Sequence, residues 1–231
     1  MKTIGLIGGM SWESSGEYYR LINEAVKAKL GGFHSAKCLL YSVDFADIEI
    51  LQREGKWPAA ARMLVSAAKS LESGGADFIV FCTNTMHKAA DEIQAQTHIP
   101  FLHIADATAQ RVKEAGLRKI GLLGTRFTME EDFYKGRLAR EFGLQVNVPN
   151  ANEREIVHRV IYDELVLGEI RPGSKRRYLD IIGRLVNEGA EGVILGCTEI
   201  GLLVHEGDCA VPLFDTTKIH ALAAVEYALA G

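Results

Sequence analysis

The residues best suited to chemistry are a cysteine and the polar pair that follows it. Cys197 comes directly after the apolar run Gly192–Gly196, and Thr198 and Glu199 come next. Such a run predicts a buried strand, so Cys197 falls where the strand ends and a loop or helix begins. The free N–H groups of a helix N-terminus favour an anion, which would lower the pKa of the thiol. Cys197 is therefore the first candidate for a reactive thiolate.

An internal repeat identifies the residue that corresponds to Cys197 in the other half of the chain. The repeat pairs Thr3–Gly8 with Lys119–Gly124 at a shift of 116, Gly75–Thr85 with Gly189–Glu199 at 114, and Pro100–Leu102 with Pro212–Phe214 at 112. In this register Thr83 aligns with Cys197, whereas Cys82 aligns with Gly196. Side chains alternate between the two faces of a strand. If Thr83 faces a ligand, Cys82 is therefore predicted to be a core residue.

The elements that must position these residues are short apolar strands alternating with longer helices. The predicted strands are Thr3–Ile7, Ala36–Val43, Phe78–Phe81, Lys119–Leu123, Leu144–Val148 and Gly192–Leu195. The predicted helices are Ser14–Lys29, Pro58–Ser73, Met86–Ala95, Asp106–Ala115 and Ser174–Glu188. Buried strands separated by helices predict an α/β fold with mostly parallel sheets covered on both faces.

Together with the repeat, this pattern predicts two similar three-layer α/β halves related by a pseudo-twofold axis. We assign residues 1–102 plus 212–231 to the first half and residues 103–211 to the second. Ligands bind beyond the carboxyl ends of parallel strands and at interfaces between similar halves. The active site is therefore expected in the cleft between the two halves.

Composition excludes several classes of protein. The 231 residues are 48% hydrophobic and 24% charged, which is enough for a core that needs no disulfides. The net charge of −4 does not attract nucleic acid. No apolar run approaches the length of about 18–20 residues that a membrane helix needs, and the start lacks the apolar core of a signal peptide. Four widely spaced cysteines and seven histidines form no metal-binding motif. We expect a cytoplasmic protein with free thiols, no metal, and no nucleic-acid or membrane partner.

The chain resembles the cofactor-independent aspartate/glutamate racemase superfamily over essentially its whole length. The resemblance is carried by Gly5–Ser14, Asp44-Phe45 with Gln52, Thr83–His87, Phe101–Asp106 and Gly196–Glu199. The Gly-Gly-Met-Ser-Trp-Glu start and the Cys-Thr-Glu-Ile element are similar to the aspartate racemase branch, close to the enterobacterial aspartate/glutamate-specific racemases. The resemblance implies a homodimer that uses neither pyridoxal phosphate nor metal. Two cysteines, one from each half, would flank the substrate α-carbon. One would remove the α-proton and the other would return a proton on the opposite face.

The sequence departs from this pattern at the first cysteine. The family has a Cys-Asn-Thr element, whereas this chain reads Thr83-Asn84-Thr85, with Cys82 one place earlier. A free thiol has a pKa of about 8.5, and an aliphatic hydroxyl is a much weaker acid that cannot stand as a base. Our hypothesis is that Cys197 abstracts the proton and Thr83 donates one, which favours racemisation from one enantiomer. The resemblance to the enterobacterial branch implies that this direction is L to D. The competing assignment makes Cys82 the second acid/base after local rearrangement.

The pocket must hold a small dicarboxylic amino acid, aspartate and/or glutamate. The resemblance implies that it is lined by Met10, Gln52, Thr83, Asn84, Thr85, Thr128, Thr198 and Glu199. Hydroxyl, amide and backbone N–H donors at strand–helix corners suit an α-carboxylate. The side-chain carboxylate needs a cation, for which Arg53 and Arg126 are candidates. His87, at a helix start, is expected to be structural.

Two other functions are compatible with these features. One is a different enzyme of the same superfamily, hydantoin racemase-like or maleate isomerase-like, which the Gly-Gly-Met-Ser-Trp-Glu start disfavours. The other is a non-catalytic module that binds a small ligand, which the missing first cysteine favours. The presence of Cys197 beside Glu199 disfavours that module, and a Cys197→Ala variant would separate it from an enzyme.

Overall fold

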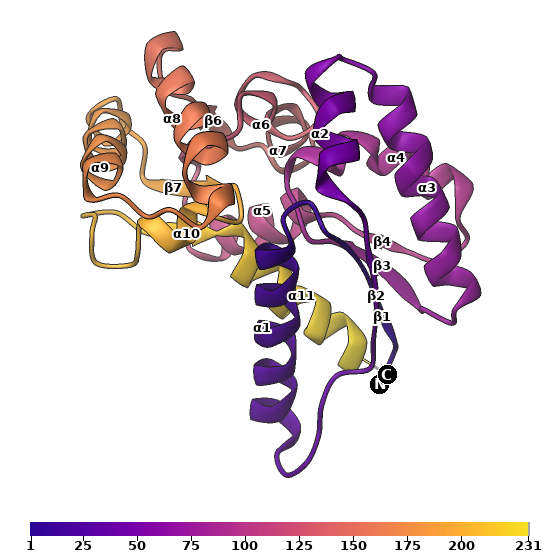
Figure 1. The fold of residues 1–231 in the computed structure, drawn as a ribbon. Coiled ribbons are helices and arrows are strands. Elements are labelled where there is room, and N and C mark those ends of the chain that lie inside the picture. Colours follow the sequence, from indigo (N-terminus) through magenta and orange to yellow (C-terminus); the bar gives the residue numbers. More distant parts are fainter. Residues whose placement is uncertain (231) are drawn as a thin grey trace. The chain divides into compact units, whose positions relative to one another are not determined.

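The computed structural model describes residues 1–230, which divide into two compact units (Figure 1). Unit 1 contains Met1–Ile104 and the C-terminal residues from His220 onward, and unit 2 contains Ala105–Ile219. The last residue of the predicted first half, Gly231, lies outside the described residues. None of the helices in the described part is long and apolar enough to cross a membrane.

Unit 1 is built on a parallel sheet of strand order β2-β1-β3-β4. Its strands are β1 (Ile4–Gly8), β2 (Cys38–Ser42), β3 (Phe78–Phe81) and β4 (Phe101–Leu102). Its helices are α1 (Trp12–Leu30), α2 (Phe45–Arg53), α3 (Trp57–Ser73), the 3₁₀ helix η1 (Thr85–Ala89), α4 (Ala90–Gln96) and most of α11 (Thr216–Leu229).

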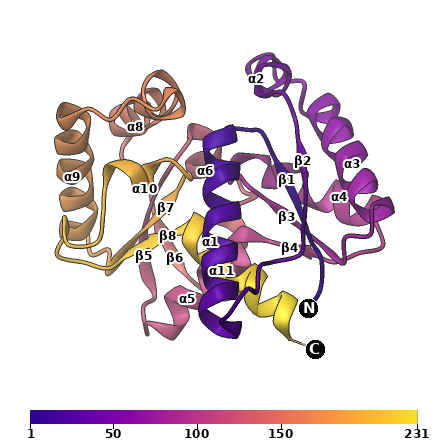
Figure 2. The ribbon, with the colours of Figure 1, turned by 60° about the horizontal axis from the view of Figure 1, so that its bottom comes forward.

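Alternation along the strands of unit 1 creates a core on each face of the sheet. Ile79 and Phe81 pack with residues of α2, α3 and α4, whereas Phe78 and Val80 pack with residues of α1 and α11. Figure 2 shows α3 and α4 on one side of these strands and α1 and α11 on the other. The unit therefore has the predicted three layers.

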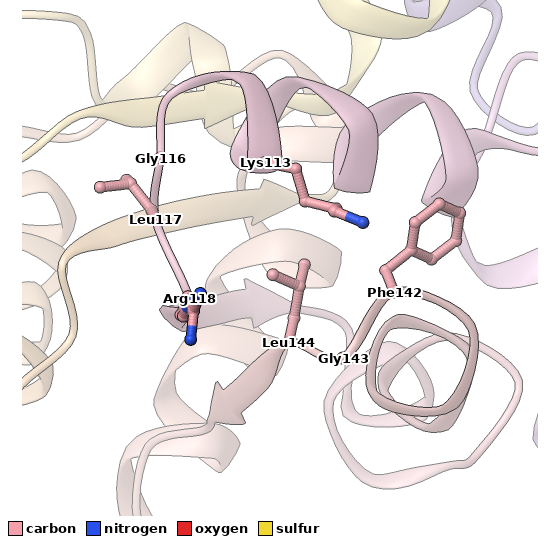
Figure 3. A pocket seen from close by; sticks show the side chains of 7 residues that line it. All are labelled: Lys113, Gly116, Leu117, Arg118, Phe142, Gly143 and Leu144. Carbon is pink, nitrogen blue, oxygen red and sulfur yellow. The ribbon is translucent and has the colours of Figure 1, made fainter.

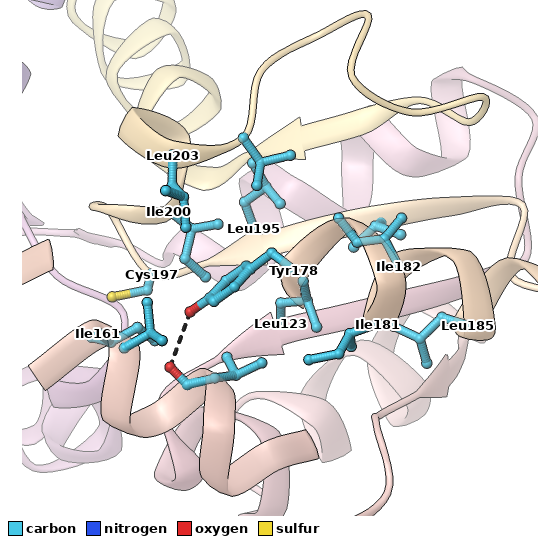
Figure 4. Packing of buried hydrophobic residues seen from close by; sticks show 14 of the residues in the cluster. Leu123, Ile161, Tyr178, Ile181, Ile182, Leu185, Leu195, Cys197, Ile200 and Leu203 are labelled. Atoms are coloured by element: carbon cyan, nitrogen blue, oxygen red, sulfur yellow. Dashed lines mark hydrogen bonds between the residues drawn. The ribbon is translucent and has the colours of Figure 1, made fainter. Parts of the chain in front are cut away.

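Unit 2 is built on a second parallel sheet, of order β6-β5-β7-β8. Its strands are β5 (Lys119–Gly124), β6 (Gln145–Asn147), β7 (Gly192–Gly196) and β8 (Leu213–Asp215). Its helices are α5 (Ile104–Glu114), which begins at the last residue of unit 1, α6 (Arg126–Glu130), α7 (Lys135–Phe142), α8 (Ala151–Asp163), η2 (Leu165–Leu167), α9 (Pro172–Asn187) and α10 (Ile200–Leu203). A core of α8, α9 and α10 residues covers β5 and β7 (Figure 4).

The predicted α/β fold with parallel sheets is confirmed, and each predicted strand is present. The repeat pairs β1 with β5, β3 with β7 and β4 with β8, and these strands occupy the same places in their two sheets. The helix that follows the fourth strand belongs to the other unit in both cases: α5 lies in unit 2, and α11 passes into unit 1.

The division between the units differs from the predicted boundaries at residues 212–219. We assigned them to the first half, but they lie in unit 2. The physical reason is that β8 pairs with β7, and Thr216 Oγ1 donates a hydrogen bond to the Leu195 carbonyl at 2.8 Å. Residues 103 and 104, which we assigned to the second half, lie in unit 1.

Candidate active site

Cys197 lies at the carboxyl end of β7, at the start of the turn that leads into α10. Its carbonyl accepts a hydrogen bond from the Ile200 N–H at 3.1 Å, which closes that turn. A side chain at the preceding residue, Gly196, would lie 2.9 Å from the Leu123 carbonyl of β5. The close approach of the two strands therefore requires glycine immediately before the cysteine. Cys197 itself is 8% exposed.

One carboxylate oxygen accepts hydrogen bonds from both residues that precede it. Cys197 Sγ donates to Glu199 Oε2 at 2.9 Å, and Thr198 Oγ1 donates to the same oxygen at 2.7 Å. The Glu199 residue is buried, and Thr198 is half-buried. The thiol thus has a proton acceptor in direct contact.

The expected lowering of the Cys197 pKa is wrong: the structure raises the pKa of this thiol well above its ordinary value. Burial is the largest cause, followed by the negative charge of Glu199 and the hydrogen bond to it. The backbone N–H groups of Thr198 and Glu199 act in the lowering direction, as predicted, but they do not prevail. Helix α10 is only 4 residues long, so its terminus competes poorly with a full carboxylate charge in contact.

An aromatic residue packs into the core beside Cys197 (Figure 4). Tyr178 of α9 is fully buried, and its hydroxyl donates to the Val157 carbonyl of α8 at 3.0 Å. Burial raises the pKa of Tyr178, and the charges of Cys197, Glu164 and Glu199 raise it further. The core around Cys197 is therefore apolar, and the Tyr178 hydroxyl within it has a hydrogen-bond acceptor.

The corresponding strand end in unit 1 carries Cys82 and Thr83 directly after β3. Cys82 donates its N–H to the Ile7 carbonyl at 3.0 Å, and its side chain is fully buried in the core shared by β3, α1 and α11. Burial raises the pKa of the Cys82 thiol far above its usual range. The prediction that Cys82 is a core residue is confirmed. Thr83 is 8% exposed, and Asn84 and Thr85 are buried beside it.

Met10 and Gln52 lie with this strand end in unit 1. Met10 follows β1, the strand that pairs with β3, and packs in the same core as Met86. Gln52 Nε2 contacts Met86 Sδ at 3.0 Å. The turn before Met10 depends on Gly9, whose φ is +90° and whose Cβ would lie 2.1 Å from a backbone oxygen. Met10, Gln52 and Thr83–Thr85 are thus positioned by neighbouring elements of one unit.

Sequence and structure comparisons identify the family. The family model described as Asp/Glu/Hydantoin racemase matches residues 7–224. The chain belongs to the Asp/Glu/hydantoin racemase family. The crystal structure of a putative Asp/Glu racemase from Yersinia pestis is 58% identical, with a TM-score of 0.93 over 99% of this chain and 100% of that one. An aspartate racemase homologue from Pyrococcus horikoshii OT3 is 38% identical, with a TM-score of 0.85 over 99% of both chains. The broad specificity amino-acid racemase RacX of Bacillus subtilis (strain 168) is 22% identical over 98% of both chains.

Within this member of the Asp/Glu/hydantoin racemase family, the remaining predicted site residues differ in their surroundings. Thr128 of α6 is fully buried, and its methyl group faces Gly196. Its hydroxyl lies 3.2 Å from that of Thr125, within the turn that begins α6. Arg53 forms an ion pair with Glu49 at 3.2 Å, whereas the Arg126 guanidinium lies 5.7 Å from the Phe127 ring. Burial of Thr128 is a packing role that the sequence did not predict.

The predicted site residues of this family member fall into two sets. Unit 1 holds Met10, Gln52, Thr83, Asn84 and Thr85, and unit 2 holds Thr128, Cys197, Thr198 and Glu199. That both sets contact one substrate stays a prediction.

Two other features concern ligands: the arrangement of metal-binding side chains, and a pocket that neither Cys197 nor Thr83 lines. Within residues 1–230 no group of three or more His, Cys, Asp or Glu side chains is arranged to hold a metal ion. A pocket in unit 2 is lined by Lys113, Gly116, Leu117, Arg118, Phe142, Gly143 and Leu144 (Figure 3). It adjoins the amino ends of β5 and β6, at the opposite edge of the sheet from Cys197. Parallel-sheet proteins bind ligands at the carboxyl edge, so this pocket is separate from the candidate site.

Proposed function

We propose that the protein racemises aspartate and/or glutamate without pyridoxal phosphate, with faster turnover from the L form at saturation. The observation that carries the proposal is the contact of Cys197 Sγ with Glu199 Oε2 at the end of β7, in a chain of the Asp/Glu/hydantoin racemase family. The substrate class is supported by the name of the 58% identical relative, a putative Asp/Glu racemase. The D-amino acid would be the product of proton transfer alone.

The first half of the proposed reaction removes the α-proton. Glu199 Oε2 takes the thiol proton of Cys197 along their 2.9 Å hydrogen bond, which produces the thiolate. The thiolate then accepts the α-proton of the L-amino acid and leaves a carbanion. Donors aimed at the α-carboxylate, for which Asn84 and Thr85 are proposed, stabilise the negative charge that spreads onto it.

The second half returns a proton on the opposite face. Thr83 donates its hydroxyl proton to the carbanion, and the alkoxide regains a proton from water. Glu199 then gives the proton that it took from Cys197 to the hydroxide that is left, which restores the starting state. Two enantiomers have equal free energy, so kcat/KM must be equal for both directions, and any asymmetry appears in kcat at saturation. Starting from the D form, the weakly acidic hydroxyl would have to act as the base, so kcat is expected to be lower in that direction.

The proposal is tested by incubating the purified protein, without added cofactor, in D₂O with L- and D-aspartate and L- and D-glutamate. Proton NMR follows loss of the α-hydrogen, and chiral chromatography follows the enantiomers. Alanine is added to the panel because RacX of Bacillus subtilis is named a broad specificity racemase. We expect exchange and inversion that disappear in Cys197→Ala. Full turnover in that variant would refute the mechanism, and no exchange with any substrate would favour a binding module.

A further inference from the structure

A buried histidine of unit 1 connects the Thr83 segment to the end of the neighbouring strand. His87 of η1 has its Nδ1 at 2.8 Å from the Thr83 carbonyl oxygen. Its Nε2 lies 3.1 Å from the backbone N–H of Ile104, two residues beyond β4. Strands β3 and β4 are adjacent in the sheet, so the imidazole ring bridges the chain segments that follow both of them.

These two contacts fix the protonation state of the ring. A carbonyl oxygen can only accept, so Nδ1 must carry the proton and donate it to Thr83. The Ile104 N–H can only donate, so Nε2 must have its lone pair free. Only the neutral tautomer with the proton on Nδ1 satisfies both partners. A protonated ring would direct a second N–H at the Ile104 N–H and lose that contact.

The surroundings of His87 maintain this neutral state. The ring is 2% exposed and packs edge to face on Phe81 and Phe101, each at a centroid distance of 5.4 Å. The titratable groups that face it are His103, at 4.6 Å, and His220, at 5.8 Å. Burial lowers the pKa of His87 well below its ordinary value, and the charged forms of the other two histidines would lower it further.

His220 is held in place by two hydrogen bonds. Its Nε2 lies 2.9 Å from the Leu102 carbonyl oxygen and must donate to it, and its Nδ1 lies 2.9 Å from the Tyr18 hydroxyl. The segment that leads from β4 to Ile104 therefore contacts two hydrogen-bonded histidines, His87 and His220. These contacts fix the segment to which His87 Nε2 is bonded.

From this geometry we infer that His87 is a positioning residue for the reaction, acting through Thr83. Its Nδ1–H holds the Thr83 carbonyl and, through the main chain, sets the direction of the Thr83 hydroxyl. The inference rests on the proposed role of Thr83 as proton donor. Loss of the Nδ1 donor should impair the return of a proton on the Thr83 face and leave proton removal by Cys197 in place.

Two substitutions separate the contacts that His87 makes. The side-chain amide of His87→Asn ends where Nδ1 lies, so it can donate to the Thr83 carbonyl, but it does not reach the Ile104 N–H. The longer amide of His87→Gln reaches the Nε2 position and can accept from Ile104, but it leaves the Thr83 carbonyl without its donor. Each variant loses one buried hydrogen bond, so similar losses of stability are expected, and the two differ in the bond that is lost.

The readout is the ratio of inversion to α-hydrogen exchange during early turnover of the L substrate in D₂O. A carbanion that is not protonated by Thr83 is returned from the Cys197 side with deuterium and with retention of configuration. We expect the ratio to fall about 10- to 100-fold in His87→Gln, since a shift of about 1 Å in a reacting group can cost about 100-fold. We expect it to stay within about threefold of wild type in His87→Asn. His87→Met, which has a similar volume and no donor, replaces His87→Gln if the latter does not fold.

The outcomes distinguish failure of this inference from failure of the proposed function. Thr83→Val is the reference, because it removes the hydroxyl and keeps the shape. If Thr83→Val retains the wild-type ratio, the role of Thr83 is wrong and the inference falls with it. If Thr83→Val lowers the ratio but His87→Gln and His87→Met do not, only the inference about His87 is overturned. Equal losses of the ratio in His87→Asn and His87→Gln would also overturn it, because a merely structural role predicts that result.

Discussion

Removal of the carboxylate at Glu199 should make Cys197 easier to alkylate, although it also removes the proton acceptor that we propose for turnover. In Glu199→Gln the negative charge beside the thiol is lost, and the amide can donate to a thiolate. Two unit charges at the observed 2.9 Å separation of Sγ and Oε2 repel by about 6 kcal/mol at an effective dielectric constant of about 20. Even if relaxation of the site halves this repulsion, about 3 kcal/mol remains, which is roughly a 100-fold change in the thiolate population. The substitution is therefore expected to lower the pKa of the Cys197 thiol.

The rate of alkylation measures this change. A less basic thiolate is a weaker nucleophile, which offsets about half of the effect on a logarithmic scale and leaves about a tenfold faster reaction at neutral pH. Iodoacetamide labelling over a range of pH, resolved by peptide mass spectrometry, reports Cys197 separately from Cys38, Cys82 and Cys209. Glu206→Gln is the matched control, because it makes the same charge change at an exposed position. A labelling profile of Cys197 that is unchanged in Glu199→Gln, or changed equally in Glu206→Gln, would refute the reasoning.

Three further predictions concern direction, packing and acid stability. Thr83→Cys should raise kcat from the D-amino acid, because a thiol can act as the base on that face; chiral chromatography that finds no increase would contradict the assigned donor. Tyr178→Phe should lower the free energy of unfolding by about 0.5–1.5 kcal/mol in urea melts, since the buried hydrogen bond from Tyr178 to the Val157 carbonyl is lost, whereas an unchanged midpoint would show that this hydrogen bond contributes nothing. The unfolded chain takes up a proton on a histidine below about pH 6.5, whereas folded His87, facing His103 and His220, does not. Stability should therefore fall as the pH drops below that value, by at most about 1.4 kcal/mol per pH unit, and His87→Asn should flatten this dependence in melts from pH 7 to 5.

The helices and strands that the sequence predicts are those whose own residues show a clear hydrophobic pattern. Buried aliphatic runs made the central strands of both sheets recognisable, and the repeat placed them in equivalent positions. Strands β4 and β8 are only 2 and 3 residues long, so their periodicity is too short to detect, although the repeat had already paired them. Helix α8 was missed although it begins with a capping box, in which Asn150 and Glu153 bond each other's backbone. An asparagine followed three residues later by a glutamate is typical of a capping box, so the start of α8 could have been predicted from the sequence.

The positions of Cys197 and Thr83 at the ends of two strands could be predicted from the sequence, whereas the electrostatics around Cys197 could not. The register alone paired Thr83 with Cys197 and assigned Cys82 to the core. The direction of the Cys197 pKa depends on the side-chain conformation of Glu199, which brings a carboxylate into contact with the thiol. Likewise, the contact of His87 with Ile104 joins residues that no short-range pattern connects. Long-range contacts of this kind arise from tertiary packing.

The passage of α11 into unit 1 has a consequence for biosynthesis. Residues 105–219 of unit 2 are continuous along the chain, whereas unit 1 also needs residues 220–230, which are translated after them. Ala221, Ala224 and Val225 of α11 fill the core against β1 and β3, and the Lys2 N–H donates to the Ala228 carbonyl at 2.9 Å. The first residues of unit 1 therefore stay incompletely packed until residues 220–230 have been synthesised, although domains commonly fold in order from the N-terminus. A released chain truncated after residue 215 would contain all four strands of the sheet behind Cys197 but would lack the α11 residues that complete the core behind Thr83.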